Sequence, residues 1–227
     1  MKINLNYFLL LLISVFTACS KSDNVGPDDN GGGSSSNSYW PLKVGNQWDL
    51  INPEDETDDM NYHIHKSLAY EGKTYFQFKP IGMEDEDLTY GIREDNGIFY
   101  ELHGVIAHNG MTISAGTIIS MNSNLNAGQE WKDEVVLNIT GSAVGTVKHI
   151  NEGKILEKSV NATINGKSYK NVIKLETKKT VINSITGITT IIAYETWLSK
   201  GVGLIFEKTT YDDINEVSYG LVDYILK

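Results

Sequence analysis

The stretch from Val144 to Asn183 reads VGTVKHINEGKILEKSVNATINGKSYKNVIKLETKKTVIN, and it decides the fold class. Apolar and polar residues alternate along it, which is the pattern of strands that turn one face to a core. Asn151-Glu152-Gly153 and Asn165-Gly166 interrupt the alternation with residues that favour turns. The pattern predicts three consecutive strands, over residues 144–150, 155–164 and 168–178.

The same signals continue on both sides of this stretch. Asp95-Asn96-Gly97 separates two alternating segments, residues 88–93 and 98–102. Because Asn-Gly tolerates the positive φ values of a type I′ turn, this segment predicts a β-hairpin. Further turns are predicted at Glu71-Gly72 and Thr186-Gly187.

Helical periodicity is weak throughout the chain. Nowhere do apolar residues recur at helical spacing for three turns without a glycine. We therefore expect a mainly β fold with few or no helices: one large curved antiparallel sheet of roughly eight to eleven strands, an open sheet or half barrel.

The first nineteen residues have the organisation of an export signal. Lys2 gives a positive start, residues 7–16 are almost wholly apolar, and Phe16-Thr17-Ala18-Cys19 ends the segment. The apolar part is too short to span a bilayer. The segment resembles the signal of bacterial lipoproteins, which implies cleavage after residue 18 and lipidation of Cys19 with palmitate-type chains. An ordinary secreted protein cleaved near Ala18 is the alternative.

Residues 20–38 read SKSDNVGPDDNGGGSSSNS and contain little that could be buried. Such a segment is typical of a flexible tether. We therefore expect a signal peptide over residues 1–18, a lipidated cysteine and tether over 19–38, and a single β domain over 39–227. The run Ser20-Lys21-Ser22-Asp23 is similar to the charged segment of surface-exported lipoproteins. It favours an outer-membrane anchor at the cell surface, slightly, over one on the periplasmic face.

Composition excludes several classes of function. Cys19 is the only cysteine, so the folded domain can have neither a disulfide nor thiol chemistry, and no cofactor is expected. The formal net charge is −10, and Arg93 is the only arginine. Nucleic acid is excluded as a partner because its binding requires clustered Lys and Arg.

Two motifs carry a family resemblance. Residues 39–48 read YWPLKVGNQW, and residues 196–205 read TWLSKGVGLI, preceded by GKSYKNVI at 166–173. In this order they resemble the YxPLxxGNxW opening and the GVGL closing strand of a group of uncharacterised Bacteroidota-type lipoproteins. The resemblance implies a curved sheet of the LolA/LolB type around an apolar cavity, although those carriers cover the cavity with helices. The motifs also have structural uses, and we expect Trp48, Trp131 and Trp197 to serve the core.

Candidate metal ligands are few. His63 and His65 lie two apart in a predicted strand, so both imidazoles share one face, as a His-x-His ligand pair requires. His103, His108 or an acid would have to complete the site, and solvated surface histidines are the expected alternative. The acidic runs at 54–59 and 84–87 could collect calcium, but they lack the register of a calcium loop and are expected to be solvated.

Three functions follow from these observations. The first is a non-catalytic, membrane-anchored binding module for an apolar ligand, a glycan or an envelope protein. Its cavity would be lined by residues such as Phe76, Phe78, Phe99 and Leu204. The second is a structural or accessory subunit of an envelope complex, with an exposed apolar patch. The third is a glycan- or lipid-processing enzyme, which would need two or more of five side chains to converge: Glu101, Glu195, Asp223, His63 and His65.

Overall fold

The computed structural model describes residues 37–79, 90–211 and 215–227, and these residues form fourteen strands and no helix. All strand pairs are antiparallel and belong to one sheet, in the order β6-β7-β9-β10-β11-β12-β13-β14-β1-β2-β3-β4-β5-β8. The predicted fold class is confirmed, whereas the predicted number of strands was too low.

The strands are β1 (Gln47–Asn52), β2 (Asp55–Tyr70), β3 (Lys73–Lys79), β4 (Tyr90–Asp95), β5 (Ile98–His103), β6 (Ile106–His108), β7 (Met111–Ile113), β8 (Gly116–Asn122), β9 (Glu130–Gly141), β10 (Gly145–Ile164), β11 (Lys167–Asn183), β12 (Thr189–Ser199), β13 (Gly203–Tyr211) and β14 (Asn215–Ile225). Cys19, the predicted signal peptide, residues 20–36 of the tether and the acidic run 84–87 lie outside the described residues.

Two-residue turns join several neighbouring strands, as the sequence predicts. Asn96-Gly97 joins β4 to β5, with φ values of 51° and 81°. Asn165-Gly166 joins β10 to β11 in the same way, at 48° and 75°. Positive φ at both positions is the geometry of a type I′ hairpin. The turn at Asn109-Gly110 was missed, because the strands β6 and β7 that it joins have three residues each and show no readable alternation.

The predicted break at Asn151-Glu152-Gly153 is wrong. Strand β10 runs without interruption from Gly145 to Ile164. Gly153 lies instead beneath the Trp131 indole, where a Cβ atom would overlap the ring. This glycine therefore serves the close approach of a side chain rather than a turn.

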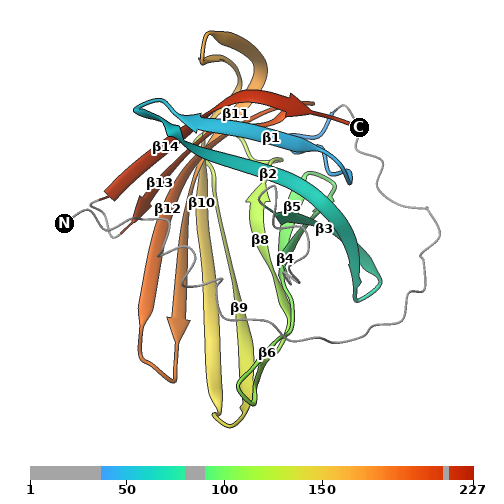
Figure 1. Ribbon diagram of the computed structural model, residues 1–227, viewed down its shortest axis with the longest axis vertical. Coiled ribbons are helices and arrows are strands. Elements are labelled where there is room, and N and C mark those ends of the chain that lie inside the picture. Colours follow the sequence, from blue (N-terminus) through green and yellow to red (C-terminus); the bar gives the residue numbers. More distant parts are fainter. Residues whose placement is uncertain (1–36, 80–89, 212–214) are drawn as a thin grey trace.

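The sheet curves until distant strands face each other. In the sheet order β11 is fifth and β5 thirteenth, yet Lys179 Nζ on β11 lies 2.6 Å from Glu101 Oε2 on β5. These two side chains must therefore point to the concave side of the sheet, which we call the inner face. Figure 1 shows the curve: β1 and β2 cross the upper end of the long strands β9 to β12, and β4, β5 and β8 lie opposite those strands.

Apolar side chains fill one end of the curve. Trp48 is fully buried there, and its Nε1 donates a hydrogen bond of 2.7 Å to the Val202 carbonyl. Gly203, at φ 103°, lets the chain pass the indole, since a Cβ atom would lie 2.6 Å from Trp48 Nε1. A smaller cluster of Leu137, Ile139 and Val147 packs separately, on β9 and β10.

The tryptophans are not all alike. Trp48 and Trp131 belong to the main core, as expected. Trp197 is half-buried on the outer face, where it packs against the same core cluster and has the Lys174 ammonium 4.2 Å from its ring centroid. The part of the chain that the structure describes contains no helix long and apolar enough to cross a membrane.

Gly153→Ala tests the packing of Trp131. We expect it to lower the free energy of unfolding by about 1–3 kcal/mol, because the indole must move from its site. The measurement is denaturant unfolding of a soluble chain that begins at Ser20 and so keeps every described residue. Glu152→Ala, which removes an exposed ion pair next to it, is the control and should cost less than about 1 kcal/mol. Equal losses in the two variants would contradict this role of Gly153.

Candidate binding site on the inner face

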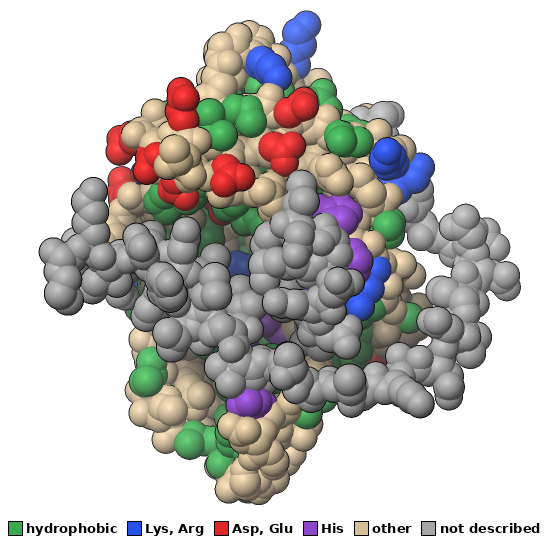
Figure 2. Space-filling view, viewed as in Figure 1, with side chains coloured by type: hydrophobic (Ala, Val, Ile, Leu, Met, Phe, Trp, Pro, Cys, Tyr) green, Lys and Arg blue, Asp and Glu red, His purple; other side chains and the backbone are tan. Residues whose placement is uncertain are grey.

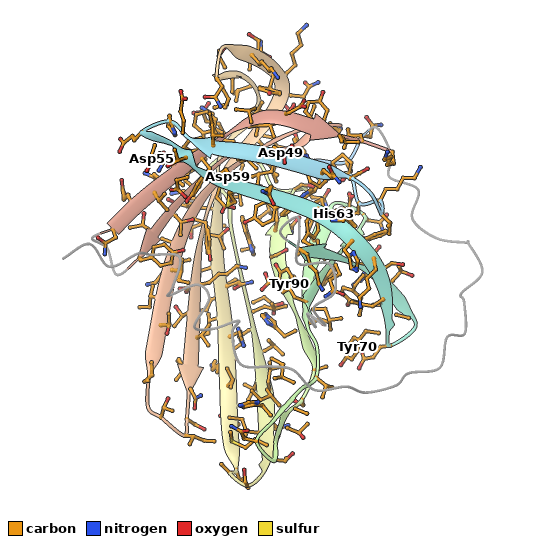
Figure 3. All side chains as sticks on the ribbon, in the orientation of Figure 1. Asp49, Asp55, Asp59, His63, Tyr70 and Tyr90 are labelled. Carbon is orange, nitrogen blue, oxygen red and sulfur yellow. The ribbon has the colours of Figure 1, made fainter. Side chains whose placement is uncertain are left out.

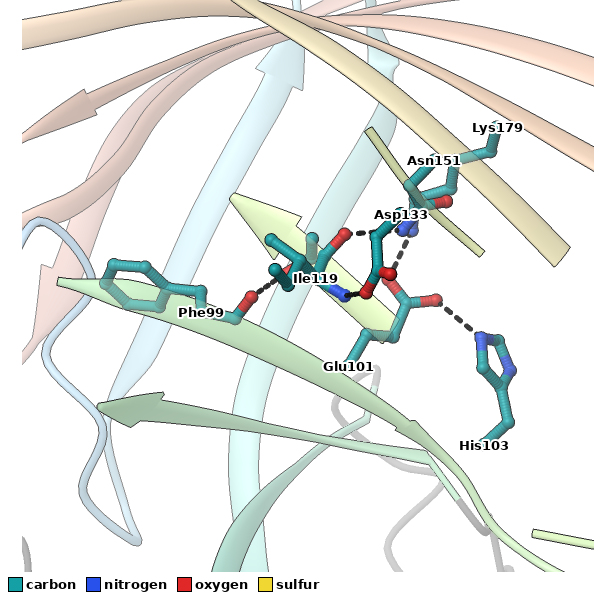
Figure 4. A network of polar contacts seen from close by, with 8 residues as sticks. Phe99, Glu101, His103, Ile119, Asp133, Asn151 and Lys179 are labelled. Atoms are coloured by element: carbon teal, nitrogen blue, oxygen red, sulfur yellow. Dashed lines mark hydrogen bonds and ion pairs between the residues drawn. The ribbon is translucent and has the colours of Figure 1, made fainter. Parts of the chain in front are cut away.

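An ion-paired carboxylate lies at the centre of the inner face. Glu101 is 3% exposed, and its two oxygens are 2.6 Å from Lys179 Nζ and 3.1 Å from His103 Nε2. Strand β5 supplies Glu101 and His103 at alternate positions, while β11 supplies Lys179 from the other side of the curve (Figure 4). Because the Glu101 carboxylate is withdrawn from water, it needs these close partners to remain charged.

The environment fixes the protonation of this group. Burial alone would raise the pKa of Glu101, but the charges and hydrogen bonds of Lys179 and His103 outweigh it and hold that pKa far below its ordinary value. His149 on β10 lies against His103, with ring centroids 4.1 Å apart. Burial, followed by the charge of His103, lowers the pKa of His149 to about 4, so its ring is neutral at pH 7.

Tyrosines and a second carboxyl group extend this polar region across the neighbouring strands. Glu207 on β13 pairs in register with Tyr219 on β14, and Tyr194 on β12 lies diagonally across from it. Burial raises the pKa of Glu207 to about 7, against the opposing charge of Lys179. The Glu207 side chain is still partly exposed, because the concave inner face remains open on one side.

The tyrosines keep their hydroxyl protons. Burial, together with the charge of Glu207, raises the pKa values of Tyr62, Tyr194 and Tyr211. Burial and the charge of Glu101 likewise raise the pKa of Tyr90 on β4, whose position is labelled in Figure 3. All four side chains are partly exposed, so they can donate hydrogen bonds to a ligand on the inner face.

Side chains also join the edge strand β8 to the opposite wall. The Ile119 N–H donates to Asp133 Oδ2 at 2.8 Å, and Asn151 Nδ2 donates to the Ile119 carbonyl at 3.1 Å (Figure 4). Asp133 and Asn151 are register partners on β9 and β10. We call these two contacts the seam. They bind the N–H and carbonyl of Ile119 to side chains rather than to another strand, and they join the edge strand β8 to β9 and β10.

The four apolar candidates belong to the core. Phe78, Phe99 and Leu204 are buried in the main cluster, and Phe76 is half-buried against it. None of them lines the depression of about 530 Å³ that crosses β9 to β12. Charged residues of those strands border that depression: Glu130, Lys132, Glu152, Lys154, Glu176 and Lys178.

His63 and His65 lie side by side on β2. His63 and His65 lie edge to face, with ring centroids 5.9 Å apart, and the register of β2 shifts between Ile64 and Lys66. Among the residues that the structure describes, no three His, Cys, Asp or Glu side chains form a group that could hold a metal ion. His103 is bound to Glu101 and lies away from this pair on β5.

The five candidate catalytic residues do not converge. Glu101 is on the inner face, whereas Glu195 accepts a hydrogen bond from Trp197 Nε1 on the outer face. Asp223 pairs with Asp49 on the side of β1 opposite Trp48 and Leu50. Carboxylates gather over β1 and β2, where Figure 2 shows a red patch, and burial and Asp223 raise the pKa of Asp49 there.

Sequence reasoning missed Lys179, His149 and Glu207. The available signal was a charged residue in the apolar register of a strand. Lys179 follows Ile173, Leu175 and Thr177 along one face of β11. Such a residue needs an inward partner, but the sequence does not reveal which strand supplies it.

The fold and this wall define a class: an open, curved antiparallel sheet with a polar and tyrosine-rich inner face. No protein-family model matches the chain, and no curated protein matches it. It is similar to the solved structure of a predicted lipoprotein from Parabacteroides distasonis ATCC 8503, with a TM-score of 0.48, 13% identity, and coverage of 83% of this chain and 99% of the other. It is also similar to a predicted exported protein with a YmcC-like fold from Bacteroides fragilis NCTC 9343, with a TM-score of 0.45, 10% identity, and coverage of 82% and 98%. At these scores the likeness defines neither a family nor a function for this chain.

Lys179→Met tests the central ion pair. We expect a loss of about 2–3 kcal/mol at pH 7, because Glu101 would remain buried without its cation. The double variant with Glu101→Gln should recover part of this loss, as measured by a denaturant double-mutant cycle. The folded state depresses the pKa of Glu101 below its ordinary value of 4.5. The ionised Glu101 therefore stabilises the folded state above pH 4.5, and this stabilisation is lost as the pH falls below that value. Strict additivity of the two single variants at pH 7 would contradict the pairing.

Proposed function

We propose that this protein is a non-catalytic binding module of the bacterial cell envelope, anchored by lipid on Cys19, whose inner face holds a polar ligand of the glycan class. The inner wall itself supports this proposal. Tyr62, Tyr90 and Tyr194 are partly exposed and protonated. The charge of Glu101 acts on Tyr90 and Tyr194, and Lys179 Nζ lies 5.6 Å from the Tyr194 ring centroid. Aromatic rings with hydroxyl groups, next to fixed hydrogen-bonding partners, suit a ligand that has both apolar ring faces and many hydroxyl groups.

An apolar ligand fits this wall less well. Lys179 keeps 28% of its side chain exposed and His103 keeps 21%, so both polar groups still contact water. An apolar molecule over them would remove that water without replacing its hydrogen bonds, at a cost of about 1–3 kcal/mol for each group. The apolar candidates Phe78, Phe99 and Leu204 are already packed against one another in the core.

An accessory subunit is the second candidate, and exposed aliphatic side chains favour it. Val144 is 82% exposed and Ile188 is 61% exposed, at the β9–β10 and β11–β12 turns. The two turns contact each other, since the Thr146 N–H donates to Ser184 Oγ at 2.7 Å. Together with Ile185, these residues form an apolar tip that could meet an envelope protein.

Tyr194→Ala tests the glycan proposal. A glycan array screened with the soluble chain from Ser20 should give a binding saccharide, and the variant should bind it about tenfold more weakly, as measured by calorimetry. Tyr100→Ala is the matched control, because Tyr100 packs with Arg93 on the face of β5 opposite Glu101. A lipid recovered by organic extraction would contradict the ligand class. Binding of neither ligand would favour the accessory-subunit function.

Cys19→Ser tests the anchor. We expect the wild type to stay with membranes after salt washing and the variant to become soluble, because two or more acyl chains contribute about 0.8 kcal/mol per buried methylene. The measurement is the fraction of protein in the membrane pellet, with Ser20→Ala as the control. Recovery of the wild type without detergent would contradict lipidation.

A further inference from the structure

Glu207 is an inward carboxyl group without a partner of its own. No hydrogen bond or ion pair joins it to any other residue within ranges 37–79, 90–211 and 215–227. Lys179 is the cation whose charge acts on it, but the Lys179 ammonium is already bound to Glu101 at 2.6 Å. A carboxyl group in this position has hydrogen-bonding capacity left for a molecule from outside.

Tyrosines lie near Glu207 on its own strand and on the neighbouring strands. Tyr219 is its register partner on β14, Tyr194 lies diagonally on β12, and Tyr211 is four residues along β13 itself. Tyr62 on β2 also lies near enough for its hydroxyl to interact with the Glu207 charge. A carboxylate among aromatic rings is the arrangement with which proteins bind organic cations.

The charges that face this position favour a cation. On β2, Asp58 accepts a hydrogen bond of 3.0 Å from the Tyr219 hydroxyl, which places a second carboxylate beside the tyrosines. On β11, the charge of Lys179 is matched by Glu101. The strands β12, β13 and β14 contribute the uncharged tyrosines Tyr194, Tyr211 and Tyr219.

We propose that Glu207 and its tyrosines bind a primary ammonium group of the ligand, so that the preferred glycan carries an amine. The inference rests on the proposed function, which it makes more specific. A hydroxyl or acetamide group would give the Glu207 carboxylate a hydrogen bond but no opposite charge. An ammonium group would give that carboxylate an ionic hydrogen bond and would lie against the tyrosine rings.

The sign of the pH dependence follows from the carboxyl group. Burial raises the pKa of Glu207 to about 7, so the carboxylate is the minor form at pH 6 and the major form at pH 8. An ammonium group binds the carboxylate form. Its affinity should therefore rise by about tenfold from pH 6 to pH 8, provided that the amine has a pKa near that of lysine.

The test uses two oligosaccharides that differ only in the substituent at the 6-positions. A cello-oligosaccharide with 6-amino groups and its 6-acetamido counterpart are titrated by calorimetry into the soluble chain from Ser20. At pH 8 the amine should bind about tenfold more tightly, and Glu207→Gln should remove both this preference and the pH dependence. Glu216→Gln, which changes a carboxylate with 60% side-chain exposure, should leave both intact.

Carboxyl-carbon NMR gives an independent readout. The amine should lower the pKa of Glu207 in the complex, and the acetamide should not. Equal affinity of the two saccharides, or a preference that survives Glu207→Gln, would overturn this inference and leave the glycan proposal standing. Binding of neither, with an unchanged Glu207 titration, would overturn both.

Discussion

A single antiparallel sheet must bury one of its faces, and in the described part of this chain the sheet has only itself to bury it against. The rest of the structure depends on this constraint. The sheet bends until β5 stands opposite β11, and Glu101 then meets Lys179 from a strand far away in the sheet order. At the Trp48 end the inner face is buried by apolar side chains that pack together. In the middle it carries polar side chains joined by ion pairs and hydrogen bonds.

The polar middle of the wall connects fold and function. Glu101 and Lys179 hold the two sides of the curve in contact, and their partly exposed neighbours face the same space. The structural ion pair and the proposed binding surface thus occupy adjacent positions of the same strands. Glu207 differs from this group because no other strand supplies it with a cation of its own among the described residues.

Alternation and turn chemistry predicted the fold class and several hairpins, since both signals are local, but they missed the short strands β6 and β7 and divided β10. Asn96-Gly97 and Asn165-Gly166 form the expected hairpins for a reason contained in two residues. Gly153 misled the sequence reasoning because its cause, the Trp131 ring, belongs to another strand. The same limit explains why Glu101 was named as a candidate and Lys179 was not: alternation shows which residues share a face of one strand, but the meeting of β5 and β11 depends on curvature and register.

The seam at Ile119 differs from the strand ladders in the kind of hydrogen bond that crosses it. Along a long ladder such as β10–β11, a row of backbone hydrogen bonds joins the two strands. At the seam, two side-chain contacts from Asp133 and Asn151 span the gap, and each can follow a displaced Ile119 by rotating about its own χ angles. A displacement of β8 relative to β9 and β10 therefore requires only side-chain rotation at the seam, and it leaves the strand order of the sheet unchanged.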